Sequence, residues 1–468
     1  MEIKGIDMSK EEREKILSIV DSCDPEIRSR IDDEIVESIF LDAARITSRA
    51  VKKKYKGIET FELKLDQILT SKYLGFPLML LLLAGVFFIT IKAANYPTQL
   101  IASGLFYIEE QLKILFKYVN APWWLDGFLI DGVYRSIAWV VSVMFPPMAI
   151  FFPIFTLLED AGYLPRVAFN LDRLFKWAGA HGKQALTMGM GFGCNAAGVV
   201  STRIIDSPRE RLIAILTNNF VPCNGRWPLI IMLASVFIVA SFPPSISSFV
   251  AAATVVSVTL FGIFITLMVS KLLSNTLLKG EPSSFKLELP PYRKPQVLRI
   301  LYTSLIDRTL FVLGRAIAMA GPAGGLIWIL GNLHLNNKTL MSYGVNFLDP
   351  LGKAIGLDGV ILLAYIIAIP ANEIIIPTII MIYSSQSKMI EMDIPQLKEL
   401  FLQNEWTILT AICLMLFSLL HYPCSTTTWT IYKETRSLKW TAISNLLPLS
   451  IALLICFIAY RIGLFIIS

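Results

Sequence analysis

Three short stretches of this 468-residue chain combine cysteine with residues that interrupt a helix. Residues 189–195 alternate glycine with apolar side chains and end in Cys-Asn, while Pro-Cys-Asn at 222–224 and Pro-Cys-Ser at 423–425 place cysteine after proline. Alternating glycines weaken a helix and bare its backbone carbonyls beside Cys194, and proline removes a backbone donor and so frees a carbonyl beside Cys223 and Cys424. Thiolate with amide or hydroxyl oxygen suits a transition-metal cation, whereas Mg²⁺ and Ca²⁺ prefer all-oxygen shells. The predicted metal ligands from these stretches are Cys194, Asn195, Cys223, Cys424 and Ser425.

Glu373 is a further predicted ligand. It lies in the apolar sequence IPANEIIIP, with no basic residue for many positions on either side. A carboxylate in hydrocarbon costs at least about 2.5 kcal/mol, so it indicates a metal ligand, a proton carrier or an ion-pair partner. A snorkelling or loop-exposed acid is the alternative. His421 is a weaker candidate ligand, because a single membrane histidine more often bonds a neighbouring helix.

Packing offers a simpler explanation for the same features. Alternating glycines also permit close helix packing, and a buried cysteine can act as a small hydrophobe. Neighbouring hydroxyl groups can satisfy a proline kink. Glu159 and Asp160, at the end of a long apolar stretch, fit an interfacial anchor as well as an ion vestibule. These alternatives stay open at the level of sequence.

Composition indicates that these residues lie in a membrane. Hydrophobic residues make up 54% of the chain and charged residues 17%, against about a quarter in soluble proteins, and mean hydropathy is +0.60. Many apolar blocks approach the roughly 20 residues that a spanning helix needs. The net charge of +6 comes from loops beside these blocks, so it indicates positive-inside bias and not nucleic acid. The charged first seventy residues argue against a cleavable signal peptide.

The predicted fold class is all-α: a polytopic helical membrane protein with two inverted repeats, each containing a re-entrant gate segment, plus a small N-terminal helical region. Loop charges predict a cytoplasmic N-terminus. Re-entrant segments are tolerated where they are buried or line a cavity. They are predicted at 184–204 and 355–383. The predicted spans are 74–93, 130–157, 209–240, 244–272, 308–332, 405–431 and 439–465.

The chain is expected to divide into five parts. They are a cytoplasmic helical spacer at 1–72, a first span with an amphipathic outer segment at 73–126, a first gate repeat at 127–280, a cytoplasmic linker at 281–307 and a second gate repeat at 308–468. Cys194–Asn195 corresponds to Ala371–Asn372 in this scheme. Inverted repeats with broken helices are typical of secondary transporters, whose sites lie near the midplane.

Enzymatic signatures are missing from the sequence. The Gly-Lys pairs at 182–183 and 352–353 lack the rest of a phosphate-binding loop, and no His-Glu-x-x-His occurs. We therefore expect no enzyme activity, no permanently bound cofactor, and no GTP site in this sequence.

Order and spacing of many motifs resemble the membrane part of the FeoB ferrous iron transporter family, from about residue 35 to 462. The motifs lie at 65–69, 74–77, 131–133, 158–163, 172–173, 181–183, 191–195, 223–228, 280–282, 288–293, 423–424 and 434–435. The resemblance implies Fe²⁺ transport, with the two gate motifs at 191–200 and 371–378, and places the helical spacer at 9–72. It also implies a location in the inner membrane.

Three departures from the family pattern affect these expectations. The usual N-terminal GTPase is absent from the sequence, which implies a separately encoded GTPase partner or freedom from GTP control. Ala196–Ala197 replaces the usual Val-Pro, and Asn372 stands where lysine is common. Expected partners are membrane lipid, the divalent metal and the GTPase, but not nucleic acid; a homo-oligomer is left open. A nucleoside or small-solute carrier and a non-conducting regulatory subunit remain the alternative functions.

Overall fold

The computed structural model describes residues 64–71, 73–239, 242–243, 246–280, 292, 296–335, 338–384, 392 and 394–467, with scattered residues between 35 and 50. Two compact units result, one of residues 1–67 with 284–286 and one of 68–283 with 287–468. Within the first unit, the described residues between 35 and 50 and at 64–67 are helical. Residues 68–71 of the predicted spacer at 1–72 fall in the second unit, and the rest of the spacer, with most of the linker at 281–307, lies outside the described residues.

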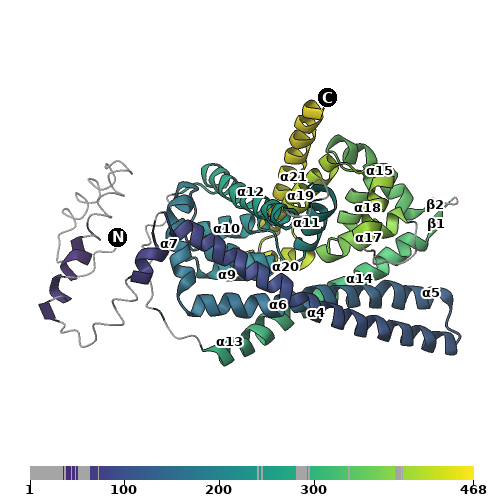
Figure 1. Cartoon of the computed structure of the whole chain (residues 1–468), viewed down its shortest axis with the longest axis horizontal. Helices are drawn as coiled ribbons and strands as arrows, with labels where there is room; N and C mark the ends of the chain where they lie inside the picture. The colour runs from purple at the N-terminus through teal and green to yellow at the C-terminus, as the bar shows by residue number, and fades with distance from the viewer. Residues whose placement is uncertain are drawn as a thin grey trace. The chain divides into compact units, whose positions relative to one another are not determined.

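The second unit begins with one long helix, α4 (Gly75–Tyr118). At 1.5 Å per residue its 44 residues extend about 66 Å, roughly twice the thickness of the hydrocarbon layer. The sequence separated a first span from an outer amphipathic segment, whereas a single helix forms both. Its polar second half stays helical because it packs along α6 (Arg135–Asp160), beside which α14 (Phe311–Asn332) also lies (Figure 1).

A first set of elements follows α4. In chain order they are α5 (Trp123–Asp126), the π-helix η1 (Gly127–Tyr134), α6, α7 (Tyr163–Trp177), α8 (Gln184–Gly193), α9 (Asn195–Ser201), η2 (Thr202–Ile204), α10 (Pro208–Thr217), η3 (Asn218–Phe220), α11 (Trp227–Leu233), η4 (Ala234–Ile238) and α12 (Ser247–Asn275). Two of its hydrophobic segments, α8–α9 and α10–α11, are interrupted in the middle.

A second set repeats this order. Its elements are α13 (Val297–Thr303), η6 (Ser304–Leu310), α14, the two-residue strands β1 (His334–Leu335) and β2 (Lys338–Thr339), α15 (Leu340–Ala354), α16 (Gly359–Ile367), η7 (Asn372–Ile374), α17 (Ile375–Tyr383), α18 (Ile394–Gln403), α19 (Ile408–Leu420), α20 (Ser425–Thr435) and α21 (Leu438–Ile467). Here α16–α17 and α19–α20 are the interrupted segments.

The backbone at the first break has the same shape in both sets. Cys194, between α8 and α9, has φ −154° and ψ 126°, and Ala371, before η7, has φ −153° and ψ 121°. An extended residue therefore stands directly before the second half of each gate segment, at the position that the sequence comparison paired. This match supports the predicted repeat.

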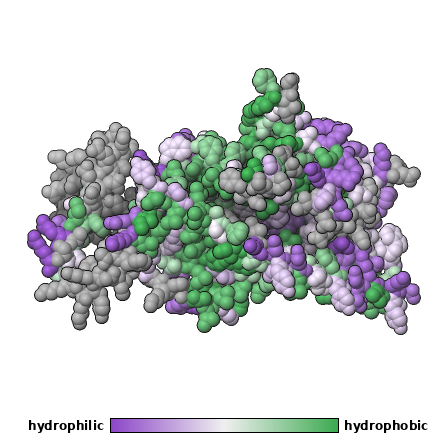
Figure 2. Space-filling view, in the orientation of Figure 1, coloured by the Kyte–Doolittle hydropathy of each residue, from purple (hydrophilic) through white to green (hydrophobic). Residues whose placement is uncertain are grey.

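Six helices of the described residues are long and apolar enough to cross a membrane, and a seventh is counted if α15 and α16, bent by 114°, form one broken span. Figure 2 shows apolar residues over the first half of α4 and polar residues over α15. The predicted helical membrane fold is confirmed. The predicted span 209–240 is interrupted at 221–226, as the proline in the sequence indicated, because Pro222 has no backbone N–H to continue the helix.

Candidate metal site

A small cavity lies where the breaks of the two sets meet. Its volume is about 30 Å³, enough for one or two water molecules or a dehydrated cation. The predicted ligands that line it are Cys194, Asn195, Cys223, Glu373 and Cys424. The structure thus brings five of the six predicted ligands to one space from four separate segments. Their binding of metal stays a prediction.

Each thiol is positioned by the end of a helix. Cys194 follows α8, and its amide donates to the carbonyl of Met190. Cys223 lies in the break before α11, which is tied to the first gate segment because the Asn224 amide donates to the Gly193 carbonyl over 3.3 Å. Cys424 precedes α20, and its Sγ lies 3.3 Å from Thr427 Oγ1.

Glu373 reaches the cavity from η7, opposite the second break of the first set. A Cβ at Gly225 would overlap the Glu373 carboxylate, so a larger residue at 225 would push this side chain out of its place. None of the ion pairs among the described residues involves Glu373. The half-buried carboxylate is therefore placed to meet a positive charge that enters the cavity.

Two candidate ligands lie elsewhere. Ser425 is not among the residues that line the cavity; its hydroxyl donates to Pro370 O over 3.4 Å and its amide to Ile369 O over 2.8 Å. His421 is buried, with Nδ1 2.9 Å from Ser418 O and Nε2 3.4 Å from Asn372 Oδ1. This histidine bonds a neighbouring segment, which is the alternative to metal binding that the sequence favoured.

The lining side chains do not form a closed coordination shell. Within the part of the chain that the structure describes, no three His, Cys, Asp or Glu side chains are grouped closely enough to hold a metal ion. A metal here would meet separate donors around a cavity, and would need them to converge for full coordination.

The glycines of 189–193 serve packing. Residues 184–193 stay helical, so the glycine carbonyls are not bared as the metal interpretation required. A Cβ at Gly189 would overlap the Phe155 ring, and one at Gly193 would overlap the Phe151 ring. Close packing of α8 against α6 is the physical reason for these two glycines.

Sequence reasoning missed a buried guanidinium beside the cavity. Arg226 is only 1% exposed and donates to the carbonyls of Leu419 (2.8 Å), His421 (3.2 Å) and Tyr422 (3.3 Å), and to both oxygens of Asn219. The Asn219 amide also donates to the His421 carbonyl. A cation from the first set thus satisfies carbonyls freed by the break in the second.

The signal for this network was available in part. An arginine and two adjacent asparagines within a hydrophobic segment indicate buried hydrogen bonding. The partners of Arg226 could not be found from the sequence, because they lie nearly two hundred positions away. Met144, Thr426 and Thr427 also line the cavity and were not predicted. The thioether of Met144 is a soft donor.

These features define a helical membrane protein in which two sets of broken helices enclose a small cavity with three thiols. A family model described as Gate, nucleoside recognition, matches residues 141–237 and 299–438, just over half of the chain. Another, described as the ferrous iron transport protein B C terminus, matches 255–307. The chain belongs to the FeoB ferrous iron transporter family.

Three relatives illustrate the match. The chain is 29% identical to the Fe(2+) transporter FeoB of Staphylococcus aureus (strain MSSA476), over 98% of this chain and 68% of that protein. It is 28% identical to an Fe(2+) transport protein A/FeoB fusion protein of Porphyromonas gingivalis (92% and 55%) and 27% identical to FeoB of Campylobacter jejuni (86% and 65%). The chain thus spans between about half and two thirds of these relatives' lengths. No solved structure matches it.

Proposed function

We propose that this protein transports Fe²⁺ across a membrane through a gated pore. The relatives named above are Fe(2+) transporters, and the helices long enough to span a membrane support the same activity. The observation that carries the proposal is the cavity between the helix breaks, where Cys194 and Cys424 come from different sets and Glu373 adds a carboxylate. Mixed sulfur and oxygen donors favour Fe²⁺ over Mg²⁺ and Ca²⁺.

The lack of a closed shell fits transit better than storage. Conduction requires an ion to bind well enough to enter and weakly enough to leave. Donors spread around a cavity meet that requirement, since no single arrangement holds the ion with all of them.

A nucleoside carrier is the second candidate, because the matching Gate family is described by nucleoside recognition. The size of the cavity argues against it. Sites for small organic ligands usually have volumes of about 300–1,000 Å³, whereas this cavity measures about 30 Å³. The volume suits an ion.

Control by GTP would have to come from outside the sequence described here. We propose a separately encoded GTPase that docks on the cytoplasmic side, together with a cytoplasmic N-terminus. The fusion of Fe(2+) transport protein A to FeoB in one relative supports partner proteins in this family. Calorimetry on the purified chain should detect no saturable GTP binding; saturable binding would contradict the proposal of a separate GTPase.

Uptake by the purified protein in proteoliposomes tests the transport function. We expect Fe²⁺ uptake that excess Mg²⁺ does not inhibit, and we expect no nucleoside uptake. Cys194→Ala and Cys424→Ala should each slow Fe²⁺ uptake strongly, as should the serine variants, because ligation requires a thiolate.

Cys456→Ala is a matched control, since Cys456 is a buried thiol that donates to the Cys413 carbonyl and does not line the cavity. Iron uptake at the wild-type rate by folded alanine variants of Cys194 and Cys424 would exclude the thiol site. Glu373→Gln would then be the variant to measure.

A further inference from the structure

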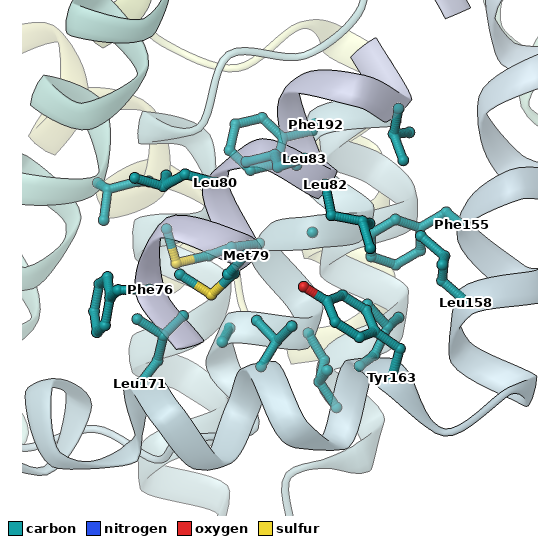
Figure 3. Close-up of a pocket in the computed structure, with 18 of the residues that line it drawn as sticks. Phe76, Met79, Leu80, Leu82, Leu83, Phe155, Leu158, Tyr163, Leu171 and Phe192 are labelled. Carbon is teal, nitrogen blue, oxygen red and sulfur yellow. The ribbon is translucent and has the colours of Figure 1, made fainter. Parts of the chain in front are cut away.

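A second and much larger cavity lies beside the first gate segment. Its volume is about 260 Å³, on the order of twenty times what one water needs. It is enclosed by α4, α6, α7, α8 and α12, and Tyr163 alone among its lining residues carries a side-chain oxygen or nitrogen. In Figure 3, Phe76, Met79 and Leu83 of α4 face Leu171 and Tyr163 of α7 across this space.

Helix α7 forms one wall of the cavity with its apolar face. The lining residues of this helix recur at helical spacing and are Tyr163, Leu164, Val167, Leu171, Leu174 and Phe175. A dry apolar cavity of this kind does not hold water well, but it accepts hydrocarbon. Leu174 of α7 and Leu260 of α12 line it and are exposed on the outside, so the cavity borders the lipid-facing surface.

The other face of α7 is basic. Arg173 and Lys176 are exposed next to Leu174 and Phe175, and one acid, Asp172, lies 2.9 Å from Lys176. Trp177 is exposed at the end of the helix, with Lys271 Nζ 3.6 Å from its ring centroid. Three cations against one carboxylate leave a net positive rim. A basic amphipathic helix with tryptophan is the pattern of an interfacial helix that attracts anionic lipid.

We propose that this cavity binds one acyl chain of an anionic phospholipid, whose headgroup contacts Arg173 and Lys176. The positive rim is the reason for choosing an anionic phospholipid over a neutral one. The bound chain would touch Ala185, Met188 and Gly189 of α8, the helix that ends at Cys194. The site goes beyond iron transport and does not depend on it, because lipid binding can be measured without metal.

Native mass spectrometry of the full chain in detergent tests the site. The probes are dipalmitoyl phosphatidylglycerol and dipalmitoyl phosphatidylcholine, titrated separately onto delipidated protein. We expect one tightly bound phosphatidylglycerol and about 25-fold weaker phosphatidylcholine, because two basic residues favour the anionic headgroup. Val167→Trp and, from the opposite wall, Leu82→Trp should each weaken both lipids about tenfold, because the indole occupies the cavity.

Arg173→Gln with Lys176→Gln removes the charges and leaves the cavity. This variant should bind phosphatidylglycerol about as weakly as phosphatidylcholine, since each basic residue near the surface is worth about fivefold in affinity. The matched control is Lys433→Gln with Lys439→Gln, two exposed lysines beside tryptophan rings elsewhere, which should change nothing.

Unchanged binding of both lipids by a folded tryptophan variant would overturn the cavity site. Equal affinity of the wild-type chain for the two headgroups would overturn the anionic preference. Thermal unfolding of each variant checks that it is folded. If Val167→Trp does not fold, Leu82→Trp provides the test. Fe²⁺ uptake in proteoliposomes is scored separately, so failure of the lipid site leaves the transport proposal standing.

Discussion

The seam between α9 and α20 should control access to the cavity from one side. These helices follow the breaks at Cys194 and Cys424, and they pack together through a small buried cluster of Val199, Ile215 and Ile431. At their far ends, Arg203 donates two hydrogen bonds to Glu434, over 2.9 Å and 2.7 Å. This ion pair closes the seam at the end that the positive-inside rule predicts to be cytoplasmic, because basic loops adjoin it.

The strength of the pair can be bounded from its exposure. The Arg203 side chain is 65% exposed and that of Glu434 is 10% exposed, so water screens one partner only. Exposed pairs contribute about 0.2–1 kcal/mol, and two-point geometry places this pair at the upper end. A loss of about 1 kcal/mol raises the population of the open seam about fivefold.

Arg203→Glu should therefore let the seam open more often. In membrane vesicles with the cytoplasmic side outward, a charged thiol reagent should label Cys424 about fivefold faster than in the wild type. Glu434→Arg should have the same effect, and the double reversal should restore slow labelling. Arg299→Glu, at an exposed arginine of α13, is the control.

The reasoning fails if the double reversal labels as fast as the single variants. It also fails if Arg203→Glu, correctly folded, labels at the wild-type rate. In the first case the charges do not act as a pair, and in the second the seam does not limit access.

Three further outcomes are expected. Arg226→Met should lower the free energy of unfolding by several kcal/mol, because each buried carbonyl that loses its donor costs about 1–3 kcal/mol. The thermal unfolding midpoint should fall accordingly, and an unchanged midpoint would refute the network. Gly225→Ala should slow iron uptake by displacing the half-buried Glu373 carboxylate, whereas Gly314→Ala, with open space around its Cβ, should not. The hydrogen bond and charge of Lys183 lower the pKa of Asp206, so their pair stabilises the fold above the ordinary pKa and is lost as pH falls. Asp206→Asn should flatten the fall of the midpoint below about pH 4, and an identical pH profile would contradict this.

Local signals were sufficient to predict the breaks. Proline at 222 and 423 removes a donor wherever the chain folds, and the apolar blocks report the membrane directly. Pairing Cys194 with Ala371 in the repeat scheme then predicted that distant segments lie at the same depth. Five of the predicted ligands do lie around one cavity. Ser425 does not line the cavity, because its hydroxyl donates to the backbone carbonyl of Pro370 in the break of the second gate segment.

Hydropathy misled where it was used to place the end of a helix. It falls after residue 93, so the first span was predicted to end there, whereas α4 continues to Tyr118. Hydropathy measures the preferred solvent of a residue, and helix continuity depends also on packing against a neighbour such as α6.

Two of the contacts between the sets differ greatly in strength, and this difference indicates where the pore opens. Arg226 joins the breaks through three buried hydrogen bonds to the carbonyls of Leu419, His421 and Tyr422, and bonds of a charged group contribute about 1.5–3 kcal/mol each. The pair of Arg203 and Glu434 contributes about 1 kcal/mol at an exposed end. A motion that separated the breaks would lose the whole network, whereas one that parts α9 from α20 loses a single ion pair and a small apolar cluster. The breaks should therefore stay together as a fixed site while the seam opens and closes beside them.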